Sequence, residues 1–189
     1  MQLRSVIGLG WVVFFTYWWI CAIGVKKNIR GKPMRRQAGL RILWIGVIAT
    51  LTQLPATKGF FQGGSPPAEI DSVRGAAGLI VCAAGFALAV WARRHLGRNW
   101  GMPMSLKEGH ELVTTGPYRY VRHPIYSGML LAMLGSAFVG GLGWMLIFIG
   151  MAIYCVYSAR TEEALMLQQF PEQYAQYKQR SKSIVPFIL

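Results

Sequence analysis

Five apolar segments, separated by short basic or turn-forming stretches, constrain this chain more than any other feature of its sequence. A helix of about 20 residues spans the hydrocarbon core of a bilayer, and basic loops are typical between such helices. Charged residues make up only 14% of the chain, against roughly 25% in soluble proteins. The pattern predicts an all-α integral membrane protein that forms one domain over residues 1–189. We place its five transmembrane helices at about 3–25, 39–54, 72–91, 125–139 and 144–160.

The distribution of basic residues predicts the orientation of these helices. Of the 20 Lys and Arg residues, only Arg4, Lys58 and Arg74 fall on the N-terminal side of the predicted membrane. Because cytoplasmic loops carry an excess of Lys and Arg, we expect the N-terminus outside and the C-terminus in the cytoplasm. Residues 97–124 and 161–189 would then lie in the cytoplasm.

The net charge of +13 follows from the same arrangement. Basic residues beside membrane helices contact anionic lipid headgroups, and no nucleic-acid recognition motif accompanies the charge. We therefore expect membrane lipids as partners and no nucleic acid.

The stretch before the fourth apolar segment is polar, basic and rich in turn signals. Gly116-Pro117 marks a turn, and His123-Pro124 marks a helix start, because proline is tolerated at the first helical position. A helix N-terminus offers free N–H groups and a partial positive charge, which favour an anionic ligand group. We expect an anion-binding loop at the water boundary.

Two adjacent glutamates, Glu162 and Glu163, follow the fifth segment in a chain with only seven acidic residues. A turn beginning at Gly140 would make the last two helices antiparallel and bring His123 and Tyr126 to the same end as these carboxylates. One interpretation is that the glutamates pair with Arg122 or Arg160. The other is that they bind the cationic end of a zwitterionic ligand.

Four spaced motifs resemble the isoprenylcysteine carboxyl methyltransferase family and, more loosely, the related phospholipid N-methyltransferases. The resemblance covers roughly residues 75–187. The sequence departs from the family pattern at Pro171, where glycine is usual, and at Ser181-Lys-Ser, where Arg-Val-Pro is frequent. The motifs are His110-x-Leu-Val-Thr-x-Gly-x-Tyr118, Arg122-His-Pro-x-Tyr-x-Gly128, Arg160-x-Glu-Glu163 and Phe170-x3-Tyr174-x2-Tyr177.

This resemblance implies that the chain binds S-adenosyl-L-methionine and releases S-adenosyl-L-homocysteine. The cofactor pocket would be cytoplasmic, between the loop before the fourth helix and the C-terminal helix and tail. Arg160 matches the catalytic arginine that orients the acceptor carboxylate. The positions that match cofactor-binding residues are His110, Glu111, Leu112, Val113, Tyr118, His123, Pro124, Ile125, Tyr126, Glu162 and Glu163.

The implied reaction methylates the carboxylate of a hydrophobic, isoprenylcysteine-like acceptor, either lipidated or a small molecule. A carboxylate with a reference pKa of about 4 is already ionised at neutral pH and needs no base, whereas an amine must first lose a proton. Since no obvious free base is present, the sequence favours a carboxylate. Phospholipid N-methylation, nicotinamide-dependent reduction of the sterol-reductase type and non-enzymatic lipid binding remain as alternatives.

Metal binding is not predicted. His95 and His110 have no cysteine or acidic partner at a suitable spacing, and Cys21, Cys82 and Cys155 are scattered through apolar segments. We expect three free thiols.

Overall fold

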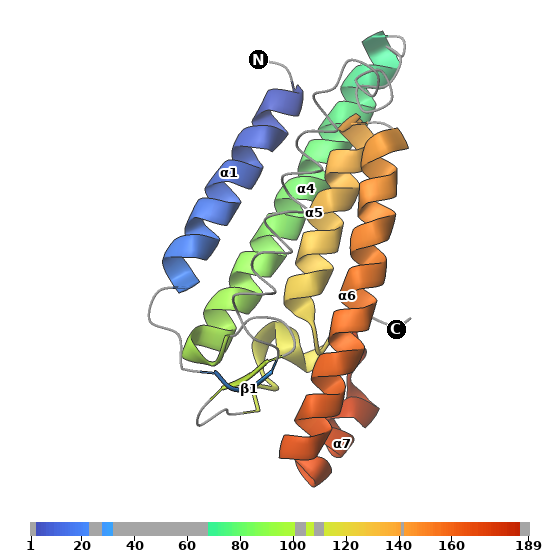
Figure 1. Ribbon diagram of the computed structural model, residues 1–189. Coiled ribbons are helices and arrows are strands. Elements are labelled where there is room, and N and C mark those ends of the chain that lie inside the picture. The colour runs from blue at the N-terminus through green and yellow to red at the C-terminus, as the bar shows by residue number, and fades with distance from the viewer. Residues whose placement is uncertain are drawn as a thin grey trace.

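The computed structural model describes residues 3–22, 28–31, 68–100, 105–107, 112–140 and 142–185. Four helices run side by side as a bundle, and a fifth, short helix lies at one end (Figure 1). The predicted second span at 39–54 lies outside the described residues, as do His110 and Glu111. The helices are α1 (Leu3–Ala22), α4 (Ala68–Leu96), α5 (Pro124–Gly140), α6 (Leu142–Gln169) and α7 (Pro171–Arg180).

Length and composition show which of these helices are suited to a membrane. Three described stretches, Leu3–Cys21, Ser72–Leu96 and Gly143–Gln169, are long and apolar enough to cross one. Helix α5 is apolar but has only 17 residues, or about 26 Å at 1.5 Å per residue. That is shorter than a hydrocarbon core of about 30 Å.

Helices α4 and α5 approach each other through glycines. A methyl group added at Gly85 would lie 2.3 Å from the backbone nitrogen of Ala132, and one at Gly135 would lie 2.4 Å from that of Cys82. Small residues allow this kind of close helix approach in a membrane. Gly78 and Gly85 of α4 therefore lie where the two backbones meet.

Helix α1 packs against this pair through aromatic contacts. The ring of Trp11 meets that of Phe86 edge to face at 4.9 Å, and its Nε1 donates a hydrogen bond of 2.9 Å to Ser136 Oγ on α5. A buried tryptophan N–H needs such a partner. Contact with both neighbours fixes α1 on the α4–α5 pair.

The turn between α5 and α6 explains how the site residues meet. Helix α5 ends at Gly140 and α6 begins at Leu142. A Cβ atom at Gly140 would lie 2.0 Å from the Trp144 ring, so only glycine fits this close approach. The two helices return antiparallel, which brings the start of α5 beside the C-terminal part of α6 (Figure 1).

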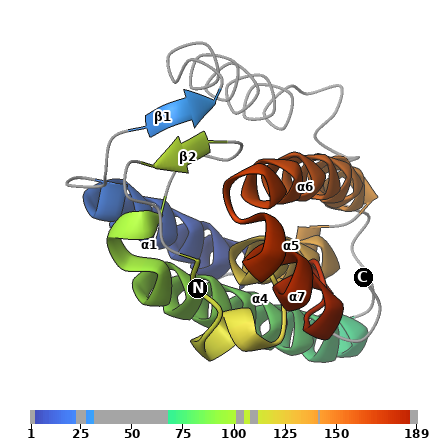
Figure 2. The same cartoon turned by 90° about the horizontal axis from the view of Figure 1, so that it is seen from below.

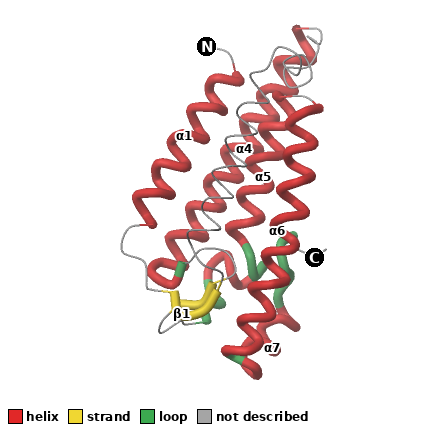
Figure 3. The backbone as a smooth tube through the Cα atoms, viewed as in Figure 1, coloured by secondary structure: helices red, strands yellow, loops and turns green. Residues whose placement is uncertain are grey.

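The prediction of an α-helical fold is confirmed, and a two-stranded antiparallel ribbon is a small addition to it. Strand β1 (Asn28–Gly31) pairs with β2 (Ser105–Lys107), at the end of the bundle where α4 ends, while α6 continues past it (Figures 2 and 3). Each strand is too short to show the alternation of apolar and polar residues that marks a strand in sequence. Because the pairing joins loops far apart in the chain, only the folded bundle brings the partners together.

Within the described residues, two short 3-10 helices also lie at this end. The helix η1 (Gly97–Asn99) ends α4, and η2 (Gly116–Arg119) precedes α5. Gly116 has φ of 60°, and the ring of His95 fills the space where its Cβ would stand. The turn predicted at Gly116-Pro117 is therefore confirmed, and it rests against the end of α4.

Candidate functional site

The C-terminal tail pairs with the segment that leads into α5. Arg122 N donates to Lys182 O at 2.8 Å, His123 N donates to Ser183 O at 2.9 Å, and Lys182 N donates to Tyr120 O at 3.2 Å. We expected free N–H groups at this helix start, but tail carbonyls accept the two that come just before Pro124. A buried N–H group needs a partner, and the tail supplies it.

The tail continues into the bundle after this pairing. Ser127 Oγ donates a hydrogen bond to Ile184 O. The Ile184 side chain is buried in a cluster with Tyr126, Cys155 and Ala159. The tail is therefore part of the packed structure around the start of α5.

Glu163 on α6 joins four partners from the segment before α5, α7 and the tail. Its Oε1 accepts from Arg122 Nε at 2.8 Å and from Ser183 Oγ at 3.0 Å. Its Oε2 lies 3.0 Å from Lys178 Nζ. The side chains of Arg122 and Glu163 are each only 8% exposed. We call Glu163, Arg122, Lys178, Ser183 and His123 together the Glu163 clasp. Pairing of a glutamate with Arg122 was one of the two interpretations that the sequence left open.

Arg122 strengthens the Glu163 clasp through its second nitrogen. Its Nη1 donates to Lys178 O at 3.3 Å and also to Ser181 O. A guanidinium with several fixed donors is well suited to a buried ion pair. The clasp thus holds the end of α7 and the first tail residues against α6.

Glu162 lies next to the Glu163 clasp but is more accessible. Tyr126 Oη donates to its Oε1 at 2.6 Å, and His123 Nδ1 lies 3.4 Å from its Oε2. Its side chain is 23% exposed, against 8% for Glu163. The rings of His123 and Tyr126 stack at 5.5 Å. Glu162 therefore has fixed neighbours and a side chain that is partly exposed.

His123 is held between the two carboxylates. Its Nε2 lies 3.5 Å from Glu163 Oε1, near enough for attraction but without hydrogen-bond geometry. Burial alone would lower the pKa of His123, but its contacts with Glu162 and Glu163 outweigh burial and raise that pKa above the ordinary value of 6.5. The imidazole is accordingly stabilised in its charged form, which has no lone pair to accept a proton.

Tyr118 fixes the loop before α5 to its surroundings. Its hydroxyl donates to Ala92 O on α4 at 3.4 Å, and its carbonyl accepts from Tyr177 Oη on α7 at 2.5 Å. Burial raises the pKa of Tyr177 to about 12, so this phenol remains a neutral donor. Leu112 and Val113, earlier in the loop, are half-buried.

The structure brings together four of the residues assigned to the site: His123, Tyr126, Glu162 and Glu163. Pro124 is fully buried at the start of α5, and Ile125 is half-buried beside it. These six residues form one continuous region at a single end of the bundle.

Arg160 lies apart from this group. It is exposed, and within the described part of the chain it forms no hydrogen bond or ion pair. Glu162 is two positions further along the chain, which corresponds to about 200° around a helix axis. Arg160 and Glu162 therefore lie on nearly opposite faces of α6.

Lys178 and Ser183 were not among the site residues named from the sequence, yet both contact Glu163. Lys178 directly follows Tyr177 of the fourth motif, so its position was a usable signal. Ser183 lies where the sequence departs from the family pattern and carries no such signal. Arg122 belonged to the second motif, although it was considered only as a partner of the glutamates.

Residues 73–173 match the family model described as phospholipid methyltransferase. The chain belongs to the phospholipid methyltransferase family. Its resemblance to the isoprenylcysteine carboxyl methyltransferases is also confirmed, as the relatives below show. Together with the long apolar helices, this membership identifies an integral membrane protein.

Curated relatives of this family member include protein-S-isoprenylcysteine O-methyltransferases from Schizosaccharomyces pombe and Arabidopsis thaliana. The first is 36% identical over 81 residues, covering 42% of this chain and 34% of the relative. The second, form B, is 36% identical over 84 residues, covering 43% of each. The cobalt-zinc-cadmium resistance protein CzcN of Cupriavidus metallidurans is 33% identical over 94 residues, covering 48% of this chain and 43% of the relative. The chain thus matches less than half the length of these relatives.

A solved structure shares the fold of this phospholipid methyltransferase family member. It is a eukaryotic intramembrane Ras methyltransferase, an isoprenylcysteine carboxyl methyltransferase, with a TM-score of 0.55 and 22% sequence identity. The superposition covers 85% of this chain and 55% of the other. At this identity the similarity shows the fold alone.

Proposed function

We propose that this chain transfers a methyl group from S-adenosyl-L-methionine to the carboxylate of a hydrophobic, isoprenylcysteine-like acceptor. The observation that carries the proposal is the partly exposed carboxylate of Glu162 beside His123 and Tyr126. These residues lie within the stretch that matches the phospholipid methyltransferase family. The cluster thus combines a defined geometry with a family-specific sequence.

Glu162, and not Glu163, binds the ammonium group of the cofactor in this proposal. The Glu163 side chain is 8% exposed and faces Arg122 and Lys178, whereas the Glu162 side chain is 23% exposed. A carboxylate offers about four lone-pair sites, so Glu162 can accept from an ammonium in addition to Tyr126. Tyr126 holds the Glu162 carboxylate in place through its hydrogen bond of 2.6 Å.

The bound cofactor would supply a methyl group on a positively charged sulfur. The remaining cofactor-binding positions carried over from the resemblance are the loop residues 110–113 and Tyr118, and residues 123–125 at the start of α5. Methyl transfer requires positioning and exclusion of water more than proton transfer. The buried contacts of Tyr118 with α4 and α7 would keep this loop in one place.

The state of His123 favours a carboxylate acceptor over an amine. An amine must lose a proton before it attacks, and His123 would be the nearest candidate base. Because its contacts with the two glutamates raise the pKa of His123, the imidazole is held in the form that cannot take up a proton. A carboxylate acceptor avoids this difficulty, since it is ionised at neutral pH.

Arg160 is proposed to bind the acceptor carboxylate. Its exposed position, on the face of α6 away from Glu162, supports a contact with the acceptor that is separate from the contact with the ammonium group of the cofactor. A lipid-embedded acceptor could approach on the outer side, while a soluble cofactor would enter between the loop and the tail. This arrangement assigns the two substrates separate routes.

For topology, we propose five transmembrane helices with the N-terminus outside and the cofactor pocket and C-terminus in the cytoplasm. The structure supports this through its charge distribution. Arg93 and Arg94 end α4, and Lys178 and Arg180 end α7, all at the end of the bundle that holds the Glu163 clasp. Basic residues gather at cytoplasmic membrane boundaries.

Phospholipid N-methylation is a second candidate, favoured by the description of the matching family model. Labelled methyl transfer onto a farnesyl-cysteine analogue and onto phosphatidylethanolamine separates the two activities. We expect product from the farnesyl-cysteine analogue. Product from phosphatidylethanolamine alone would reverse the assignment of the acceptor.

Isothermal titration with S-adenosyl-L-homocysteine in detergent tests the cofactor site. Glu162→Gln should weaken binding about tenfold or more, a loss of about 1.4 kcal/mol for each factor of ten. Glu172→Gln is the matched control, because Glu172 is exposed on α7 and should leave affinity unchanged. Equal affinity in both variants would remove Glu162 from the site, and no binding to the unaltered chain would refute methyl transfer.

The role of Arg160 is separable by the same titration. Arg160→Ala should reduce turnover of the acceptor while leaving S-adenosyl-L-homocysteine affinity unchanged. Equal loss of both properties would mean that Arg160 does not act on the acceptor side.

A further inference from the structure

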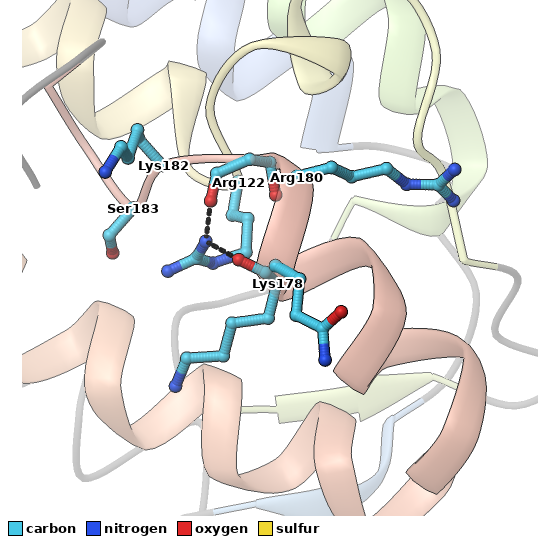
Figure 4. A pocket seen from close by; sticks show the side chains of 7 residues that line it. Arg122, Lys178, Arg180, Lys182 and Ser183 are labelled. Atoms are coloured by element: carbon cyan, nitrogen blue, oxygen red, sulfur yellow. Dashed lines mark hydrogen bonds between the residues drawn. The ribbon is translucent and has the colours of Figure 1, made fainter.

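A pocket of about 320 Å³ lies against the outer side of the Glu163 clasp. Seven residues line it, all but one of them from the end of α7 and the tail, and Figure 4 shows them together. Four of the lining residues are basic and none is acidic. The pocket lining comprises Arg122, Lys178, Gln179, Arg180, Ser181, Lys182 and Ser183.

Arg122 supplies a fixed positive charge to this pocket. Its side chain is 8% exposed and is held by Glu163 and by the carbonyls of Lys178 and Ser181. A guanidinium held this way presents its remaining edge in a set orientation, which suits phosphate oxygens. The pocket therefore contains a hydrogen-bond donor, the Arg122 guanidinium, whose orientation is fixed before any ligand binds.

The other charged side chains are placed unequally around Arg122. In Figure 4, Lys182 and Ser183 lie to the left of Arg122 and the Lys178 side chain runs below it, whereas Arg180 extends away to the right. Glu163 offers one carboxylate to both Arg122 and Lys178. Since Lys182 adds a further cation, the pocket keeps a net positive charge and suits an anion.

The surroundings of the pocket indicate which kind of anion it takes. Tyr120 is 62% exposed, and its carbonyl accepts a hydrogen bond from Lys182 N at 3.2 Å. Val185, three residues later in the tail, is 39% exposed. Exposed tyrosine beside basic residues is typical of the headgroup level of a bilayer. A ligand there would meet apolar side chains as well as cations.

We propose that this pocket binds the phosphate of an acidic phospholipid headgroup. The fixed guanidinium and the two lysines pair with the phosphate oxygens, and Ser183 lies within the same lining. Tyr120 and Val185 border the apolar part of the lipid. A zwitterionic headgroup is disfavoured because its ammonium would face a site that is already positive. The site is separate from Glu162 and does not depend on the proposed methyl transfer.

The test uses the full chain in detergent and measures the melting temperature during titration with short-chain phosphatidylglycerol. Phosphatidylcholine of the same chain length is the headgroup control. Lys182→Gln is compared with Arg180→Gln, since both residues are exposed and each substitution removes one positive charge. We expect Lys182→Gln to weaken the apparent Kd about fivefold, as a lost cation near a lipid surface does. Arg180→Gln should leave it nearly unchanged.

Three further measurements decide the outcome. Lys182→Arg should restore the affinity, and all three variants should melt like the unaltered chain when no lipid is added. Equal effects of Lys182→Gln and Arg180→Gln, or equal stabilisation by phosphatidylcholine, would overturn the pocket as the binding site. If inorganic phosphate stabilises the chain as well as phosphatidylglycerol does, the ligand is free phosphate and the lipid assignment is wrong.

Discussion

The α4–α5 interface and the Glu163 clasp are both tightly packed, but different forces hold them. At Gly85 and Gly135 the two helix backbones nearly touch, and neutral side chains surround them. Around Glu163, buried groups of opposite charge meet within 3.5 Å. Inside a membrane apolar burial gives helices little reason to associate, so close packing must hold them. At the boundary, buried charges persist only when they are paired.

This difference predicts that the clasp is vulnerable to loss of charge and the interface to added volume. Each region should tolerate the change that damages the other. The predictions below test this contrast, beginning with the largest expected effect.

Glu163→Gln should be the most damaging substitution. It leaves Arg122, His123 and Lys178 without their shared carboxylate, and removing one partner of a buried ion pair costs about 3–5 kcal/mol. The free energy of unfolding in detergent measures the loss. Glu172→Gln removes an exposed carboxylate from α7 and should change this free energy little. If the two variants unfold alike, the clasp does not stabilise the fold.

Gly85→Ala should come next, with a loss of about 1–3 kcal/mol from overpacking. Its new methyl group would lie 2.3 Å from the backbone of α5, so the helices must separate. Gly8→Ala on α1 meets nothing within 4 Å, and there the higher helix propensity of alanine should stabilise by up to about 1 kcal/mol. Melting temperatures should therefore move in opposite directions. A shift in the same direction would contradict close packing at Gly85.

The smallest expected effect is a dependence of stability on pH that arises from the titration of His123. Its pKa is raised in the folded state, so its stabilising effect is complete below about pH 6.5, the ordinary value. The effect is lost as pH rises through the higher folded-state pKa. Melting temperature should fall over that range in the unaltered chain and fall less in His123→Gln. Identical profiles would show that His123 is not charged in the clasp.

The sequence predicted those features whose signals are local. Gly140 indicated the tight turn, and His123-Pro124 indicated the start of α5, because glycine and proline act on the backbone where they stand. Given the turn, helix geometry alone brings His123 and Tyr126 to the end of α6 where the glutamates lie.

The sequence could not separate the roles of Glu162 and Glu163. The two residues are adjacent and chemically identical, and they differ only in the neighbours that they face. Glu163 faces Arg122, Lys178 and Ser183, whereas Glu162 faces Tyr126 and stays more exposed. The exposed position of Arg160, across α6 from Glu162, likewise follows from the packing of the helix.

Hydropathy, charge and motif spacing were thus enough to predict a membrane bundle, its family and the end of the bundle where we propose the site. The tail required the tertiary structure. Lys182 and Ser183 meet the segment before α5 through backbone hydrogen bonds, which any residue type can form. The two-stranded ribbon between Asn28–Gly31 and Ser105–Lys107 is likewise held by backbone hydrogen bonds. Such pairings depend on which segments the folded helices bring together, and no local pattern of side chains records them.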